Sequence, residues 1–520
     1  MRARTLLEGV GASLLLLFSH YLPFFHPRNH DLFHHGLPVT HLVGGLLIDL
    51  LGVALLVSAA LMAVDHLPAN VRKYLLALFA ALMIWKSIAV SFTLLFRLRL
   101  GVGRYEHFWD HWVVYLLVLG CVTAYLWPRF TDRAVRATRI LVAAFAFSGL
   151  WIVPWLVVIA ASRPYVSPAL AEGNLPPASY SPGPRVIWVL FDELSYDQTF
   201  EHRAPGIDLP NFDRLRSMSV SFSHVRPIGY YTDRIIPSLF MDKTFTEFRS
   251  TISGELYFGE NGKWVRFDPN TTLFAVAKKN GWNPGVDGWY NPMCNILAPV
   301  VITCSWSPDV LPGEEYGASE DRSALTNSTA VVREAADFAT GREITPADTH
   351  VRDYREIMAR AKALIGNDRL HFLYLHLPIP HPPGIYDRGR HELQSHGNYL
   401  DNLVLSDDAL SELMSEIKAS PAADRTILIV TSDHSWRTAI YRDRADWTAE
   451  EERASGGKFD DRPVLLVHFP DQFKSEDYSA PISEMVEYDF IVGMLDRQIQ
   501  SEHDLESLAV KAPAGLQARR

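Results

Sequence analysis

The chain has 520 residues, of which 48% are hydrophobic and 21% charged, and its formal net charge is −10. Residues 1–163 contain 7 acidic and 14 basic residues, whereas the rest of the chain contains 52 acidic and 35 basic residues. This asymmetry excludes a single soluble globule and argues against a nucleic-acid-binding protein, whose working domain is basic. With 3 cysteines, a disulfide-rich scaffold and a cysteine-based zinc module are also excluded.

The first third of the chain is strongly apolar. Five apolar stretches each approach the roughly 20 residues that a helix needs to cross the hydrocarbon core of a bilayer. They lie near residues 5–24, 42–64, 74–96, 111–127 and 139–161. The sequence therefore predicts a transmembrane domain of five spans over residues 1–163. With the N-terminus inside, the inner segments hold eight Lys and Arg residues and the outer ones five, so the chain after residue 163 is predicted outside.

A proline-rich segment and a change of pattern follow the membrane half. Residues 164–184 contain six prolines, which no helix interior tolerates, and this segment is predicted to be an extended linker. Beyond it, short apolar runs rich in β-formers alternate with helical stretches, which predicts an α/β domain with buried parallel strands. The predicted strands are 185–191, 371–377, 425–431 and 462–469, and the predicted helices are 271–280, 351–365 and 399–418. We assign residues 185–500 to this domain and 501–520 to a tail.

Polar side chains follow two of the predicted strands, at the edge where open α/β sheets place their sites. Asp192 and Glu193 come directly after the first strand, and Asp433 and His434 follow the third. Carboxylates and an imidazole are suitable ligands for a divalent cation. A further segment, YYTDRIIPSLF, contains Thr232, whose hydroxyl becomes a nucleophile when a cation lowers its pKa. Taken singly, each of these residues is also compatible with a helix cap or a local turn.

Taken in order, these segments resemble the sulfatase/alkaline-phosphatase superfamily. The resemblance rests on VIWVLFDELSYD, LPNFDRLRSMSVSFSHV, TDRIIPSLF, NTTLFAVAKKNGWNP, LHLPIPHPP and IVTSDHSW, which lie within residues 185–470 in the order of that family. Five spans followed by an external domain of this kind are similar to the membrane phosphoethanolamine and phosphoglycerol (lipoteichoic-acid synthase-like) transferases of bacteria. The resemblance implies an alkaline-phosphatase-like α/β catalytic domain with a central, mostly parallel sheet.

Carried over motif by motif, the resemblance implies a metal site and a nucleophile. Asp192, Thr232, Asp433 and His434 would hold the catalytic metal, and the Asp-His pair favours zinc or manganese over calcium. Thr232 would be the nucleophile. His381, in LHLPIPHPP, would contact the phosphoryl group or assist the leaving oxygen.

Two more residues, Glu193 and His376, are implied as weaker candidates for substrate contact. The transferases usually carry Glu at the first metal position, whereas this chain has Asp192 followed by Glu193. Which of these two carboxylates binds metal, and whether one or two metals bind, therefore stays open at this point.

The leading hypothesis is the metal-dependent transfer of a phosphoethanolamine or phosphoglycerol headgroup from a phospholipid donor to an envelope glycan or lipid acceptor, through a phospho-Thr232 intermediate. Such a protein lies in the bacterial inner membrane, with its catalytic domain on the periplasmic or extracellular side. The first alternative is a phospho- or sulfo-ester hydrolase on the same scaffold, and the second is a non-catalytic membrane binding module. Thr232 does not lie in a C/S-x-P-x-R motif, which argues against sulfate-ester hydrolysis.

Two of the cysteines, Cys294 and Cys304, bracket a short loop of the external domain. A disulfide is permitted in that environment, and we predict one here. Closing so short a loop would contribute about 2–3 kcal/mol in the chain-entropy model.

Overall fold

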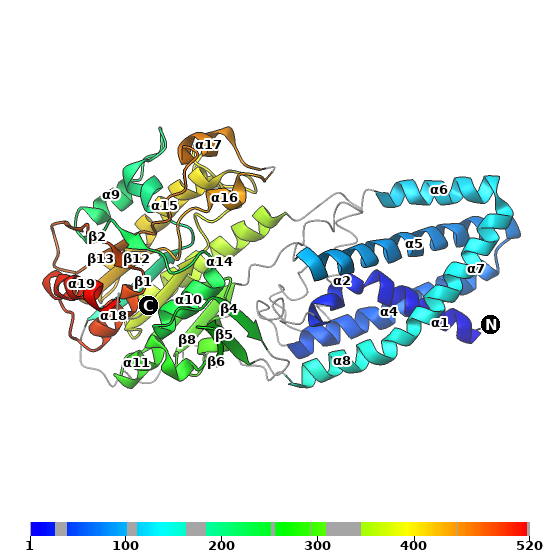
Figure 1. Cartoon of the computed structure of the whole chain (residues 1–520), viewed down its shortest axis with the longest axis horizontal. Coiled ribbons are helices and arrows are strands. Elements are labelled where there is room, and N and C mark those ends of the chain that lie inside the picture. The colour runs from blue at the N-terminus through cyan, green and yellow to red at the C-terminus, as the bar shows by residue number, and fades with distance from the viewer. Residues whose placement is uncertain are drawn as a thin grey trace.

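The computed structural model describes residues 2–25, 39–100, 112–162, 184–250, 255–291, 293–307, 345–444 and 446–516. Figure 1 shows a group of long helices, drawn in blue and cyan, and an α/β part, drawn from green to red. The predicted linker, apart from its last residue, lies outside the described residues.

Three helices of the described N-terminal part are long and apolar enough to span a membrane. They are Val43–Asp65, Ala69–Ser91 and Pro128–Ser162. The prediction of five spans is therefore wrong for the described residues. The first predicted span is broken after α1, and α6 comprises 15 residues within the described part of the chain, fewer than the roughly 20 that a span needs. The helices of this part are α1 Arg2–Leu16, α2 Phe18–Tyr21, η1 Leu22–Phe25, α4 Val39–Asp65, α5 Ala69–Leu100, α6 Trp112–Leu126, α7 Pro128–Phe145, η3 Ala146–Ser148 and α8 Gly149–Ser162.

α1 is packed closely against its neighbours although it is short. A Cβ on Gly9 would overlap backbone and side-chain atoms of α4, and one on Gly11 would overlap the carbonyl oxygen of Val142 in α7. Glu8 of α1 is fully buried and accepts hydrogen bonds from Arg139 of α7 at 2.7 and 3.0 Å. A buried carboxylate is costly without such a partner. Close backbone approach and a buried ion pair therefore join α1 to α4 and α7.

The α/β part is built on a central sheet, as predicted. Its strand order is β14-β2-β13-β12-β1-β9-β7-β8. β1 pairs in parallel with β12 on one side and with β9 on the other. The strands are β1 Arg185–Phe191, β2 Val220–Phe222, β7 Pro284–Trp289, β8 Thr303–Ser307, β9 Phe372–Leu377, β12 Thr426–Thr431, β13 Leu465–His468 and β14 Glu476–Tyr478.

One strand direction differs from the prediction. β13, within the predicted strand 462–469, pairs antiparallel with both β12 and β2. The apolar run of β13 predicts that both of its faces are buried. It does not predict the direction of the strand, because a parallel and an antiparallel strand at this position are buried equally. The sheet is therefore mostly, not wholly, parallel.

Helices cover both faces of the sheet. Val186, Trp188 and Leu190 pack in a core with α10, α11, α18 and α19, whereas Ile187 and Val189 pack in a second core with α9, α14 and α15. Successive side chains of a strand point to opposite faces, so a strand covered on both sides is apolar throughout. These helices are α9 Pro210–Arg216, α10 Thr232–Met241, α11 Leu273–Lys279, α14 Pro346–Gly366, α15 Tyr399–Ala419, α18 Val486–Leu495 and α19 Glu502–Leu516. The three predicted helices correspond to α11, α14 and α15.

The C-terminal segment and the disulfide complete this part. Residues predicted as a tail include α19, whose Leu505 and Ala509 are fully buried in the first core. Cys294 and Cys304 form a disulfide, which confirms the predicted bridge. The remaining elements are η5 Asp197–Glu201, β3 Val225–Arg226, β4 Glu247–Ser250, β5 Leu256–Glu260, β6 Lys263–Arg266, η6 Pro269–Thr271, α12 Met293–Leu297, β10 Tyr386–Asp387, β11 Glu392–Leu393, η7 Ala423–Arg425, α16 Thr438–Tyr441, α17 Ala449–Ser455 and β15 Ile482–Ser483.

Candidate active site

The carboxyl ends of β1 and β12 bring four of the predicted residues together. Asp192 follows β1 directly, and Asp433 and His434 follow β12. Because these strands are parallel neighbours, the residues lie at the same edge of the sheet. Thr232 is the first residue of α10. The side chains of the two aspartates and the histidine are fully buried, and Thr232 is 6% exposed.

The hydroxyl of Thr232 lies among the ligand atoms of this group. Its Oγ1 donates a hydrogen bond to Asp433 Oδ2 over 2.7 Å. The same oxygen is 3.3 Å from Asp192 Oδ2 and 3.4 Å from His434 Nε2. The N-terminus of α10 adds the positive end of a helix dipole at this point. A negatively charged oxygen on Thr232 is therefore favoured by its position.

Glu193 has a left-handed backbone next to this group. Its φ is 67°, a value that non-glycine residues rarely adopt. Its N–H donates to Asp433 Oδ1 over 3.2 Å, and its carbonyl accepts from the Tyr399 hydroxyl over 2.9 Å. Its buried side chain accepts at Oε1 from the Tyr441 hydroxyl over 2.6 Å and from Arg437. Backbone strain that so many contacts hold in place indicates a functional position.

The donor set fits a divalent cation. Asp192, Glu193 and His434 each offer a ligand atom within 4.8 Å of the others. Burial lowers the pKa of His434, so the imidazole is neutral. Its Nδ1 lies 3.1 Å from the carbonyl oxygen of Ser435, so Nδ1 carries the proton and Nε2 presents a lone pair. His434 Nε2 is 3.1 Å from Asp433 Oδ2, so two acceptor atoms face each other, and both residues would hold a cation.

The charge balance of the buried group supports the same conclusion. Burial raises the pKa of Glu193, a shift that Arg437 and His434 oppose. Asp192 and Asp433 are fully buried beside it. Several buried carboxylates in one place are unfavourable unless positive charge offsets them. Carboxylate and imidazole ligands suit zinc and manganese alike.

The two histidines outside the predicted ligand set lie beside this group. His376 of β9 is fully buried, and its Nε2 is 3.1 Å from Asp192 Oδ2. Burial lowers the pKa of His376 to about 4, so a neutral ring orients the carboxylate. His381 Nε2 accepts a hydrogen bond from Arg437 over 3.1 Å and lies 3.4 Å from the Tyr441 hydroxyl. His376 therefore contacts a candidate ligand, and His381 belongs to the network around Glu193.

Sequence reasoning missed three residues of the site. Arg437 contacts Glu193 and also donates to the carbonyl of Tyr230 over 3.1 Å. Asn291 Nδ2 donates to the carbonyl of Thr232 over 3.1 Å and so supports the start of α10. Arg437 follows the predicted Asp-His pair by three positions in TSDHSWR, so its place in that motif is a usable signal. Tyr441 and Asn291 carry no such signal, because their partners are 248 and 59 positions away in the chain.

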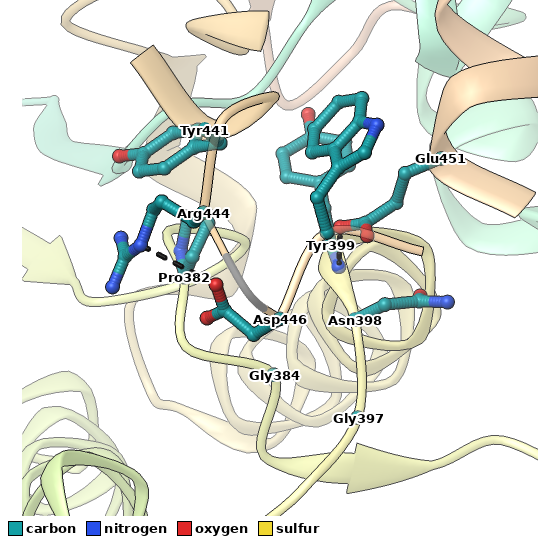
Figure 2. Close-up of a pocket in the computed structure, with 10 residues that line it drawn as sticks. Pro382, Gly384, Gly397, Asn398, Tyr399, Tyr441, Arg444, Asp446 and Glu451 are labelled. Carbon is teal, nitrogen blue, oxygen red and sulfur yellow. Dashed lines mark hydrogen bonds and ion pairs between the residues drawn. The ribbon is translucent and has the colours of Figure 1, made fainter. Parts of the chain in front are cut away.

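A small cavity is lined in part by Tyr441. Figure 2 shows Tyr441, Tyr399 and Arg444 around it, together with Asp446, whose carboxylate pairs with Arg444 at 3.4 Å. The guanidinium of Arg444 is 5.4 Å from the centre of the Tyr441 ring. The cavity measures about 20 Å³, enough for about one water molecule. It is too small for a substrate.

Fold and site together define an α/β domain with a mostly parallel central sheet and a candidate metal centre at the carboxyl edge of that sheet. The family model described as Sulfatase matches residues 184–496, more than half of the chain, and the chain belongs to this family. It is accordingly a sulfatase-family enzyme that acts on phosphate or sulfate esters. Comparison with curated proteins finds no match.

Three solved structures illustrate a limited likeness. Phosphonate monoester hydrolase of Agrobacterium radiobacter is 13% identical, over 60% of this chain and 74% of that one, with a TM-score of 0.38. The PsFucS1 sulfatase from Pseudoalteromonas sp. is 12% identical, over 61% and 69% of the two chains, with a TM-score of 0.40. Murine ectonucleotide pyrophosphatase/phosphodiesterase 5 is 12% identical, over 60% and 95%, with a TM-score of 0.36.

Proposed function

We propose that this protein transfers a phosphoethanolamine or phosphoglycerol headgroup from a phospholipid donor to an envelope glycan or lipid acceptor. The observation that carries the proposal is the position of the Thr232 hydroxyl, 2.7 Å from Asp433 Oδ2 and within 3.4 Å of Asp192 and His434. The same chain has three helices able to span a membrane, which suits a donor that stays in the bilayer. We place the enzyme in the bacterial inner membrane, with its catalytic domain on the outer side.

In the first half-reaction, Thr232 is the nucleophile. Its Oγ1–H points to Asp433 Oδ2, and as Oγ1 attacks phosphorus its proton passes by way of this carboxylate to solvent. The new Oγ1–P bond forms while the bond from phosphorus to the diacylglycerol oxygen breaks. That oxygen takes up a proton from solvent, which balances the one lost by Thr232, and leaves as the alcohol diacylglycerol. Asp192, Asp433 and His434, together with Glu193, would hold a divalent cation, which would supply Lewis acidity that lowers the pKa of the hydroxyl and offsets phosphate charge.

In the second half-reaction, an acceptor hydroxyl or phosphate attacks the phosphorus of phospho-Thr232. The new bond from the acceptor oxygen to phosphorus forms as the Oγ1–P bond breaks. An acceptor hydroxyl gives its proton to solvent, and Thr232 Oγ1 takes up a proton from solvent. The N–H of Glu193 donates to Asp433 Oδ1 over 3.2 Å and so holds the Asp433 carboxylate in place in both half-reactions. Arg437 and Tyr441 in turn hold the side chain of Glu193. A hydrolase differs only at this stage, because water then replaces the acceptor.

Intact mass spectrometry of the full-length protein tests the proposal. Wild type and Thr232→Ala are incubated with phosphatidylethanolamine or phosphatidylglycerol and with zinc or manganese. We expect a phosphoethanolamine or phosphoglycerol adduct on the wild type that Thr232→Ala does not form. Thr271→Ala, which changes an exposed threonine whose hydroxyl donates to the carbonyl of Asp268 over 2.8 Å, should form the adduct like the wild type. Ester turnover that survives Thr232→Ala, with no adduct on any variant, would exclude Thr232 and the transferase.

The two alternatives give different results in the same experiment. For a hydrolase, the adduct disappears at the same rate with and without a glycan or lipid acceptor, and free headgroup phosphate accumulates. For a non-catalytic binding module, the protein binds metal and lipid but forms no adduct and releases no product.

A further inference from the structure

Three aromatic side chains are exposed beside the candidate active site. Tyr230 and Tyr231 are 46% and 49% exposed, and Phe459 is 43% exposed. Tyr230 and Phe459 come from segments more than two hundred positions apart, yet their ring centres lie only 5.9 Å apart. We call these three residues the aromatic rim. Large aromatic side chains exposed together on a folded domain indicate an interaction surface.

The aromatic rim adjoins the nucleophile. Tyr231 directly precedes Thr232 and is the N-cap residue of α10. The carbonyl of Tyr230 accepts a hydrogen bond from Arg437 over 3.1 Å, and Arg437 also contacts Glu193. A molecule whose phosphorus lies at Thr232 Oγ1 therefore has the aromatic rim within reach of its remaining part.

Basic side chains accompany the aromatic rim. The guanidinium of Arg234 is 4.6 Å from the centre of the Tyr231 ring, and its side chain is 32% exposed beside Asp233, with which it pairs at 3.5 Å. Lys458, the residue before Phe459, is exposed. Aromatic and basic side chains together are typical of surfaces that lie at the boundary between phospholipid headgroups and acyl chains.

We propose that the aromatic rim binds the glycerol and acyl portion of a phospholipid whose phosphate lies at Thr232. This inference rests on the proposed function and names the part of the donor that the rim recognises. The apolar rings match the acyl portion, and Arg234 and Lys458 match the anionic phosphodiester. Lipid is favoured as the occupant because the three membrane-spanning candidates of the same chain hold the domain close to a bilayer.

The first test compares two donors in the full-length protein. Dioleoyl phosphatidylethanolamine is supplied in nanodiscs, and dibutyryl phosphatidylethanolamine, which has the same headgroup, is supplied free in solution. The rate of adduct formation on Thr232 is measured for wild type, for Tyr230→Ala/Phe459→Ala, and for Phe473→Ala as a control. Phe473 is 84% exposed and lies in the loop between β13 and β14.

We expect the ratio of the dioleoyl rate to the dibutyryl rate to fall about tenfold in the double variant, which corresponds to about 1.4 kcal/mol. The ratio should not change in Phe473→Ala. An unchanged ratio in the double variant would overturn the inference. So would normal adduct formation with slow transfer to the acceptor, because the rim would then bind the acceptor.

A second test does not depend on the chemistry. Phe459→Cys and Phe473→Cys are made in a Thr232→Ala/Cys121→Ser background and labelled with an environment-sensitive fluorophore. The full-length proteins are placed in nanodiscs with or without phospholipids that carry a nitroxide on the acyl chain. Quenching at position 459 but not at position 473 supports the rim as the lipid contact, and equal quenching at both, or none, contradicts it. If no donor forms an adduct with the wild type, the proposed function fails. The quenching measurement then still shows whether the aromatic rim contacts phospholipid.

Discussion

The hydroxyl of Tyr441 donates a hydrogen bond of 2.6 Å to Glu193 Oε1, and this contact orients a buried carboxylate at the edge of the candidate metal centre. Glu193 is one of three residues whose ligand atoms lie within 4.8 Å of one another. Partners of this kind tune metal affinity because they fix the direction of the ligand.

Tyr441→Phe removes that hydrogen bond and keeps the ring. We expect metal affinity to fall about tenfold, the lower end of the range for a lost outer-shell partner, with the fold intact. Equilibrium metal titration of the purified protein measures the change. Tyr386→Phe is a matched control, because it removes a hydrogen bond of the same 2.6 Å length, from Tyr386 to Asp408. Equal metal affinity in the two variants would show that Tyr441 does not support the site.

Metal removal is expected to destabilise the catalytic domain, because buried carboxylates lose the cation that offsets their charge. Restoring zinc or manganese at 100 times its Kd should increase the free energy of unfolding by about 2.7 kcal/mol. Asp433→Asn should abolish this response, while Asp213→Asn, which changes a side chain that is 52% exposed, should keep it. Thermal unfolding with chelator and with added metal measures both. A response that persists in Asp433→Asn would place the metal elsewhere.

A buried carboxylate outside the site should make stability depend on pH. Burial raises the pKa of Glu487 to about 8, although Thr431 and Trp188 donate hydrogen bonds to it. The folded protein therefore keeps a proton that the unfolded chain loses near pH 4.5. Glu487 contributes its full stability below about pH 4.5, and this contribution is lost as the pH rises to about 8, with a slope of about 1.4 kcal/mol per pH unit.

Glu487→Gln mimics the protonated side chain. The slope of the free energy of unfolding against pH, between pH 5 and 8, should therefore become smaller in this variant by about 1.4 kcal/mol per pH unit. Burial also raises the pKa of the neighbouring Glu484, so some pH dependence persists in the variant. Denaturant unfolding at several pH values measures the slope. Glu412→Gln changes an exposed carboxylate that pairs with Lys362 and serves as the control. The same slope in wild type and Glu487→Gln would show that Glu487 ionises in the folded state near its ordinary pKa.

The helical part can be tested at two glycines. Gly11→Ala places a methyl group on the carbonyl oxygen of Val142, so α1 must move away from α7. We expect a lower unfolding temperature in detergent, because close backbone approach holds these helices together. Gly52→Ala in α4 is the control, since its added Cβ would meet no atom within 4 Å. Equal unfolding temperatures for the two variants would mean that α1 does not pack as described.

Much of the α/β part could be predicted from local pattern alone. β1 and β12 lie where their continuous apolar runs predict them, because a strand buried on both faces needs apolar side chains at every position. The position of Asp192 after β1, and of Asp433 and His434 after β12, follows from the same rule of strand ends. By itself, the sequence therefore determined these strands and the residues at their carboxyl ends.

Only the tertiary structure decided what depends on distant contacts. The direction of β13 follows from its pairing with β12 and β2, and the left-handed backbone of Glu193 is held by Tyr399, which lies 206 positions away. The number of candidate membrane helices depends on where each helix ends, and the amino-acid composition does not predict that α1 ends at Leu16. Each of these features is a contact or a break in regular backbone, and hydrophobic periodicity carries no information about either.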